Sequence, residues 1–277
     1  MLKNLGVSRS GYYAWLVHLP SKTQNRKDAI QEKIQKIYDD SKQNYGSPKI
    51  TETLHQEGEI ISQRTVGKYM KLMGIKAQWV KPYTVTTKNS DFSRKLKNIL
   101  NENFNPDRPN AVWCCDITYI WTEYGFVYLT SIMDLFSRKI IGWTLSKTMD
   151  VSCVIQTIDK AKARRRNVTP LIIHSDRGTQ FVSKDYIKAT ENIQLSYSKK
   201  AFPWDNACIE SFHALIKREW LNRFKIRNFC HAYQLVFEYI EAFYNTVRIH
   251  SHCDYLSPDD YERLYKNNLE TEIGLAS

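Results

Sequence analysis

Residues 111–121 read AVWCCDITYIW, a run of apolar, aromatic and β-branched side chains interrupted by one acid. Side chains of these kinds favour extended strands. Two runs of similar character follow at residues 126–135 and 139–145, and short polar segments at residues 122–125 and 137–138 separate the three runs. The stretch therefore predicts a three-stranded antiparallel meander.

Beyond the meander, the chain alternates between helical and extended patterns. We expect a helix over residues 151–166, a strand over 171–174, a helix near 184–191, a strand over 193–197, and helices that begin near Asn206 and His231. A meander followed by this alternation predicts a mixed α/β domain.

The first third of the chain is predicted to be helical. After a short helical element over residues 6–16, amphipathic helices are expected over residues 28–42, 47–58 and 62–74. The second of these would begin with Ser47 as its N-cap, because a serine followed by a proline is typical of a helix start.

The last two of these helices predict a helix-turn-helix unit, because a tight turn joins them and the second is basic and polar on one face. On this interpretation DNA is approached by Ser62, Gln63, Arg64 and Lys68, whereas Val66, Tyr69 and Met70 pack inward. The alternative is a plain three-helix bundle whose lysines are only solvated.

Positive charge is concentrated in the same part of the chain. Residues 1–100 hold 18 lysines and arginines against 8 acids, an excess of +10, while the whole chain carries +11. A basic surface of this kind favours a polyanion through counterion release, and nucleic acid is the usual partner. The less specific alternative is a lysine-rich surface that serves only solubility.

The compartment and the redox state follow from what the sequence contains. We find no apolar run of the ~20 residues that a membrane span requires, and no signal peptide at the first residues, so we expect a cytoplasmic protein. The six cysteines form no CxxC pair. Cys230 and His231, taken with the run from His250 to Cys253, offer zinc-ligand types without a recognised ligand spacing, so we regard them as ordinary residues.

Three acids stand out by position. Asp116 lies in the middle of the first predicted strand, Asp176 lies at the end of its own strand, and Glu210 lies near the start of an amphipathic helix. A carboxylate inside a strand is costly unless something pairs with it. Lys217 lies two helical turns after Glu210 and therefore on the same face.

Taken together, these acids predict a site for phosphoryl transfer. Two strand acids and one helix acid are hard oxygen ligands of the kind that a pair of Mg²⁺ ions requires for in-line displacement. Any one of them alone is weak evidence, since an aspartate at a strand end is usually a turn residue. The adjacent His174, Ser175 and Asp176 do not form a hydrolase triad, because neighbouring strand residues point to opposite faces.

Several ordered motifs resemble the second-reading-frame (orfB) transposases of bacterial insertion sequences, which carry a retroviral-integrase-like DDE domain. The motifs are W-x-x-DITY at 113–119, DLFSRKIIGW at 134–143, HSDRGTQF at 174–181, WDNA-x-x-ESF at 204–212 and YN-x-x-R-x-H at 244–250, with YGSPKI at 45–50 matching the helical unit. They cover nearly the whole chain. Cys115 stands where the family usually has threonine.

The resemblance implies an α/β fold in which an RNase H-like integrase core, a mixed sheet flanked by helices, follows a small all-α helix-turn-helix domain. It assigns the catalytic DDE triad, which also binds the metal, to Asp116, Asp176 and Glu210. It further implies two Mg²⁺ ions, replaceable by Mn²⁺, and the cutting and joining of double-stranded DNA at element ends. Arg177 and Lys217 are expected to steer phosphates.

The predicted domain plan follows from these assignments. It comprises an N-terminal helical segment (1–27), a helix-turn-helix-like DNA-binding domain (28–80), a linker (81–105), the integrase-like catalytic domain (106–268) and a tail (269–277). The expected partners are DNA of the element ends and of the target, further copies of this chain on DNA, and an upstream-frame protein, with no membrane. When bound to DNA the protein would associate with the nucleoid.

Three questions stay open at this stage. The abrupt start fits either a complete second-frame product or a fragment of a longer fused transposase. A structure-specific nuclease of the same fold would use the same acids and release hydrolysed ends instead of joined strands. A DNA-binding regulator without catalysis is the alternative from another class, and the three intact acids count against it.

Overall fold

The computed structural model describes residues 6, 8–17, 21–78, 96–166, 168–199 and 203–275. The chain divides into two compact units, residues 1–78 and residues 79–277, and each unit is described by itself. Most of the predicted linker, residues 81–95, lies outside the described residues.

The first unit is all helical and contains α1 (Arg9–Leu16), α2 (Lys22–Asp40), α3 (Ser47–Gln56) and α4 (Gln63–Leu72). Helices α2, α3 and α4 share a core in which Ile34, Ile50, Leu54 and Val66 are fully buried. Apolar side chains at helical spacing on each helix supply this core, so the helical prediction is confirmed for this unit.

The helix starts differ in detail from the predictions. Helix α2 begins at Lys22 and not at Asp28, because the Ser21 hydroxyl accepts a hydrogen bond from the Gln24 backbone amide (3.1 Å) and caps an earlier turn. The N-cap of α3 is Gly46, and Ser47 is already helical. Helix α4 begins at Gln63, and Ser62 is its N-cap, since its hydroxyl accepts a hydrogen bond from the Thr65 amide at 3.2 Å.

The second unit contains a five-stranded sheet in the order β3-β2-β1-β4-β5. Its strands are β1 (Val112–Thr122), β2 (Gly125–Asp134), β3 (Ile140–Ser146), β4 (Ile172–Ser175) and β5 (Gln194–Tyr197). The first three strands pair antiparallel, and β4 and β5 run parallel to β1. The predicted meander and the mixed sheet are therefore confirmed.

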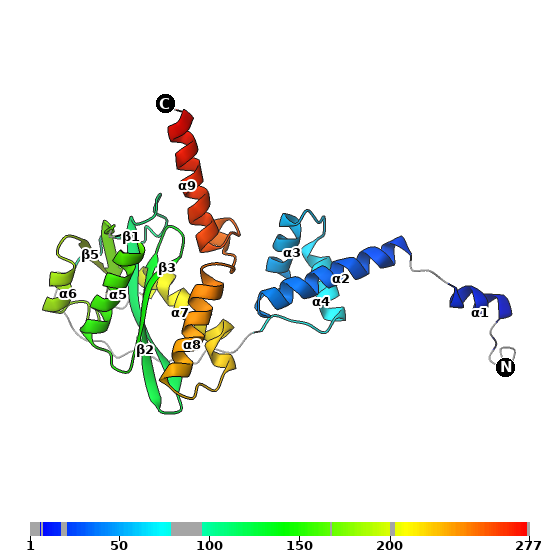
Figure 1. The fold of residues 1–277 in the computed structure, drawn as a ribbon, viewed down its shortest axis with the longest axis horizontal. Coiled ribbons are helices and arrows are strands. Elements are labelled where there is room, and N and C mark those ends of the chain that lie inside the picture. The colour runs from blue at the N-terminus through cyan, green and yellow to red at the C-terminus, as the bar shows by residue number, and fades with distance from the viewer. Residues whose placement is uncertain are drawn as a thin grey trace. The chain divides into compact units, whose positions relative to one another are not determined.

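Helices cover both faces of this sheet (Figure 1). Helices α5 (Val151–Arg164) and α6 (Lys184–Ala189) pack on the face that carries Trp113 and Ile132. Gly142 of β3 permits close packing of α5, because a Cβ atom there would lie 2.7 Å from the Thr157 carbonyl oxygen. Helices α7 (Ala207–Glu219) and α8 (Phe229–Tyr239) lie against the opposite face, on which Asp116 stands.

The last residues of the predicted linker belong to the sheet unit. The Ser196 hydroxyl of β5 accepts hydrogen bonds from the backbone amides of Ile99 and Leu100, both at 2.9 Å. Asp205, just before α7, accepts a hydrogen bond from the Asn98 side chain at 2.9 Å. Residues 96–104 are therefore packed against β5 and the start of α7.

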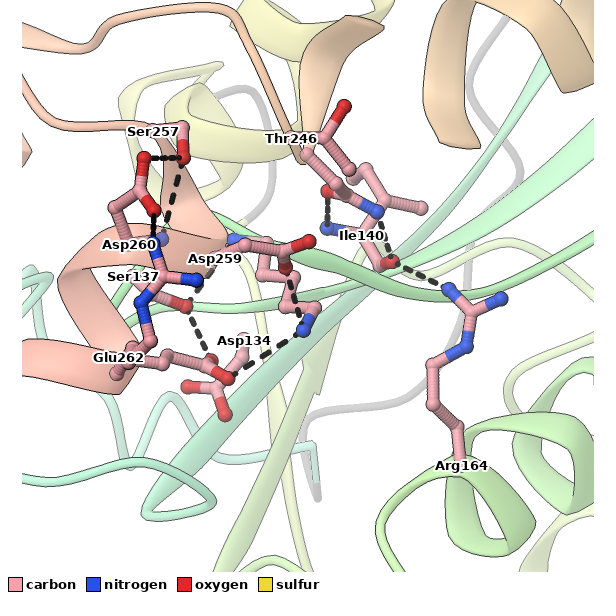
Figure 2. Close-up of polar contacts among 12 residues, drawn as sticks. Asp134, Ser137, Ile140, Arg164, Thr246, Ser257, Asp259, Asp260 and Glu262 are labelled. Atoms are coloured by element: carbon pink, nitrogen blue, oxygen red, sulfur yellow. Dashed lines mark hydrogen bonds and ion pairs between the residues drawn. The ribbon is translucent and has the colours of Figure 1, made fainter. Parts of the chain in front are cut away.

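A long C-terminal helix, α9 (Pro258–Leu275), is anchored to the end of β2. Figure 2 shows Glu262 of α9 beside Ser137, whose hydroxyl donates to the Glu262 carboxylate at 2.6 Å. Arg165 joins Glu262 to the fully buried Asp134, with N···O distances of 2.5 and 3.0 Å. The helix then projects from the unit (Figure 1). It includes residues 269–275 of the predicted tail.

No helix in the described ranges combines the length and apolar composition that crossing a membrane would require.

Candidate active site

The pairing of β1 with β4 places Asp116 and Asp176 at neighbouring positions. The two strands run parallel with a constant register from Val112 opposite Ile172 to Cys115 opposite Ser175. Each aspartate is the next residue, Asp116 within β1 and Asp176 just past the end of β4. Parallel strands bring paired residues to the same level, so Asp116 and Asp176 lie beside each other at the point where β4 ends.

The turn after β4 holds the Asp176 carboxylate. The Gly178 backbone N–H donates to Asp176 Oδ1 at 2.8 Å. A Cβ atom on Gly178 would approach that same oxygen to 3.0 Å, so glycine permits this close contact. Burial and the negative charge of Asp116 raise the pKa of Asp176 to about 6. The two carboxylates therefore repel each other, and a bound cation would relieve the repulsion.

Glu210 and Lys217 approach the same place from α7. Glu210 lies in the first turn of α7 with an exposed side chain. Partial removal from water and the charges of Asp116 and Asp176 raise the pKa of Glu210. The Lys217 ammonium lies 4.3 Å from the centre of the Tyr119 ring. Burial lowers the pKa of Lys217, while the charge of Asp116 opposes that shift.

Arg177, predicted to steer phosphates, is engaged by the backbone. Its Nε donates to the Ser198 carbonyl at 2.7 Å and its Nη2 donates to the Leu96 carbonyl at 3.3 Å. These hydrogen bonds join the turn after β4 to the residue that follows β5 and to the segment before β1. The structure thus gives Arg177 an architectural role that the sequence did not reveal.

His213 is a site residue that the sequence reading missed. It lies on α7 and is 5% exposed. Its Nδ1 is 3.3 Å from Asp116 Oδ2, and its Nε2 is 3.3 Å from the Ser131 hydroxyl. The spacing of three residues after Glu210 puts both on one side of α7, which is the signal that could have drawn attention to it.

The donor set suits a divalent metal ion in its chemistry. Asp116, Asp176 and Glu210 offer carboxylate oxygens, the ligands that Mg²⁺ prefers. Among the residues that the structure describes, no three His, Cys, Asp or Glu side chains are already arranged to hold a metal ion. Asp116 and Asp176 are the pair that the strands bring together, and the exposed Glu210 is the ligand that would have to turn inward.

In the first unit, the residues predicted to contact DNA lie on the outer side of α4. Ser62, Gln63, Arg64 and Lys68 are all exposed. Val66 and Met70 are buried, as predicted, whereas Tyr69 is only half-buried. The exposed side chains therefore form a polar surface over α4 that is free of core packing.

Comparison with known protein families matches three parts of the chain. An HTH-like domain matches residues 25–83, and an integrase core domain matches residues 106–203 and, in a second description, residues 191–258.

Comparison with solved structures finds retroviral integrases. The HTLV-2 integrase catalytic core domain in complex with magnesium is 17% identical, with a TM-score of 0.43, and the match covers 56% of this chain and 97% of that chain. A simian T-cell lymphotropic virus intasome, in complex with PP2A regulatory subunit B56 gamma, is 15% identical with a TM-score of 0.46, over 83% of this chain and 74% of that one.

Characterised relatives match over most of the chain. The transposase for insertion sequence element IS904 of Lactococcus lactis is 38% identical over 88% of this chain and 97% of its own length. Transposase InsF for insertion sequence IS3A of Escherichia coli K12 is 33% identical over 95% of this chain and 92% of its own length. With an HTH-like domain followed by an integrase core domain, the chain belongs to the family of insertion-sequence transposases.

Proposed function

We propose that this protein cleaves DNA at the ends of an insertion sequence and joins those ends to target DNA by metal-dependent phosphoryl transfer. The observation that carries the proposal is the parallel register of β1 and β4, which sets Asp116 beside Asp176. Helix α7 supports it by placing Glu210 where both aspartates raise its pKa.

Each acid has a proposed part in the chemistry. Asp116 and Asp176 would hold Mg²⁺ or Mn²⁺ between them, and Glu210 would complete the ligand set for a second ion. When bound, the metal ions would activate the attacking oxygen and neutralise charge at the scissile phosphate. The Gly178 amide keeps Asp176 Oδ1 oriented throughout.

Lys217 is the proposed phosphate ligand of the catalytic unit. It lies on α7 near Asp116, and its ammonium group lies over the face of the Tyr119 ring, which stabilises the positive charge. A cation in this place offsets the like charges that the acids and a phosphodiester would otherwise bring together. Arg177 contributes by holding the turn that carries Asp176.

The first unit is proposed to bind the element ends. The N-terminal residues of a recognition helix contact base edges, and in α4 these positions are exposed and polar. We assign Gln63 and Arg64 to base contacts, and Ser62 and Lys68 to the phosphate backbone. Because two ends must be held together for joining, several copies of this chain would assemble on DNA, with or without an upstream-frame protein.

The proposal is tested with purified full-length protein and labelled duplexes that carry the inverted repeats of the element. Incubation in Mg²⁺ or Mn²⁺ should yield nicked ends and products joined to a second duplex, and EDTA should abolish both. Hydrolysed ends without any joined strands would favour a structure-specific nuclease. Specific binding without cleavage in either metal, with and without the upstream-frame protein, would favour a DNA-binding regulator.

A further inference from the structure

We propose that His213 is a positioning residue that fixes the Asp116 carboxylate, and with it Glu210, in the orientation needed to bind the metal ions. This inference rests on the function proposed above. It concerns a buried residue that is not one of the three acids.

The contacts of His213 join three elements of the catalytic unit. Asp116 of β1 and Ser131 of β2 are direct cross-strand partners, and the His213 ring from α7 lies between their side chains. Nδ1 is 3.3 Å from Asp116 Oδ2 and Nε2 is 3.3 Å from Ser131 Oγ. A carboxylate oxygen can only accept, so an N–H on Nδ1 would donate in the first contact.

This arrangement restricts the Asp116 carboxylate. A carboxylate rotates easily about its terminal bond when nothing holds either oxygen. A donor on Oδ2 fixes the plane of the group and thereby the direction in which Oδ1 points. Residues that hold metal ligands in this way commonly change metal affinity by about 10–100-fold when they are removed.

The same ring sets the position of α7. Residues three apart on a helix lie on neighbouring parts of its surface, so Glu210 stands next to His213. Anchoring His213 to β1 and β2 limits rotation and sliding of α7 over the sheet. The Glu210 side chain is exposed at the surface of α7, so its approach to Asp176 depends on where α7 sits.

A buried histidine that only fills space would be the simpler explanation. His213 is 5% exposed, and its ring centre lies 5.5 Å from that of Phe212 in a tilted arrangement, so a packing role is real. The two roles differ in which substitutions at residue 213 would preserve them. Packing requires volume, whereas positioning requires a hydrogen-bond donor at the place of Nδ1.

A matched pair of substitutions separates them. His213→Asn keeps a donor close to the position of Nδ1, and His213→Leu has the same branching without a donor. Each full-length protein is titrated with Mn²⁺, and free Mn²⁺ is followed by its electron paramagnetic resonance signal. Thermal unfolding without metal shows whether each variant is folded. Ser131→Ala is measured alongside, because it removes only the hydroxyl that holds Nε2.

The expected result is Mn²⁺ binding that is about tenfold or more weaker in His213→Leu and close to wild type in His213→Asn. Ser131→Ala should weaken binding by a smaller factor. Normal Mn²⁺ affinity in folded His213→Leu overturns the inference. If His213→Leu does not fold, normal Mn²⁺ affinity in folded Ser131→Ala overturns it. So does a loss of affinity in folded His213→Asn as large as the loss in a further variant, Asp116→Asn, which removes the ligand charge itself. Failure of the wild-type protein to bind Mn²⁺ would instead remove the proposed function on which the inference rests.

Discussion

Asp116 and Asp176 stand side by side because β1 and β4 keep one parallel register up to the residues that precede them. The site is therefore built by the backbone of the sheet, and only its third acid depends on a helix. Burial of Asp176 beside a second carboxylate costs the folded protein free energy, and these two effects raise the pKa of Asp176 to about 6. Natural sites commonly retain such a cost where function requires it.

Removal of the Asp176 charge should stabilise the protein. A carboxyl group whose pKa rises from 3.8 to about 6 on folding contributes full stability below about pH 4, and that contribution is lost as the pH rises through 6. At pH 7.5 in EDTA, Asp176→Asn should thus raise the free energy of unfolding by roughly 1–3 kcal/mol. The gain, measured by urea unfolding, should shrink as the pH falls toward 4.

The control for this experiment is Asp185→Asn, which removes an exposed carboxylate in the first turn of α6. It should change stability little at either pH. Equal stability of wild type and Asp176→Asn across the pH range would show that the acid pair is not strained. Added Mg²⁺ should stabilise the wild-type protein more than Asp176→Asn.

Lys217→Ala should weaken DNA binding by the catalytic unit in a salt-dependent way. Loss of one phosphate contact lowers the slope of log affinity against log salt by about one. Fluorescence anisotropy with a labelled duplex at several salt concentrations measures this slope. Lys266→Ala, which removes a lysine with a 76% exposed side chain on α9, should leave the slope unchanged. Identical slopes for both variants would argue against Lys217 as a phosphate ligand.

In the first unit, Lys68→Ala should reduce affinity for the element ends more than Lys36→Ala does. Both lysines are exposed, and each substitution removes one positive charge from the same unit. Only Lys68 lies on α4, so only its loss should remove a phosphate contact. Equal effects in a gel-shift titration would indicate a diffuse electrostatic attraction and no recognition helix.

The Tyr-Asn-x-x-Arg-x-His motif should prove structural. Arg248 forms two hydrogen bonds to the buried Glu219 carboxylate, at 2.7 and 2.8 Å, and Tyr239 donates to the same group. Arg248→Met removes one partner of a buried ion pair and should cost about 3–5 kcal/mol in urea unfolding. Replacing Glu219 by leucine in the same protein should restore much of this loss. If Arg248→Met lowered the free energy of unfolding by less than about 1 kcal/mol, the Arg248–Glu219 pair would contribute no more than an exposed ion pair, and the motif would not be structural.

The sequence predicted the elements well where local pattern decides them. The β-branched and aromatic runs of β1, β2 and β3 and the apolar stripe of α7 each carry their own period, and the structure has them within a residue or two. The grouping of Asp116 with Asp176 in one site was predicted, but the parallel pairing of β1 with β4 that brings them together was not. The start of α2 was wrong because Ser21 caps a polar first turn that shows no apolar period.

Other features depend on contacts that no local pattern records. The Ser196 hydroxyl accepts hydrogen bonds from the backbone amides of residues 99 and 100, which lie far from it in the sequence. Arg177 donates to backbone carbonyls that only the folded sheet brings near. His213 contacts Asp116 and Ser131 only because α7 packs on β1 and β2. Helix α9 was missed although Pro258 and two acids in its first turn are typical of a helix start.

The central claim is that the strand-paired acids perform phosphoryl transfer, and strand transfer by Asp176→Asn tests it most directly. Wild type, Asp176→Asn and Asp185→Asn are compared at equal concentration on pre-cleaved element ends in Mg²⁺ and in Mn²⁺, after urea unfolding has shown all three to be folded. The account predicts that Asp176→Asn still binds the DNA but forms no joined product, while Asp185→Asn joins strands like the wild type. Undiminished joining by Asp176→Asn would contradict it.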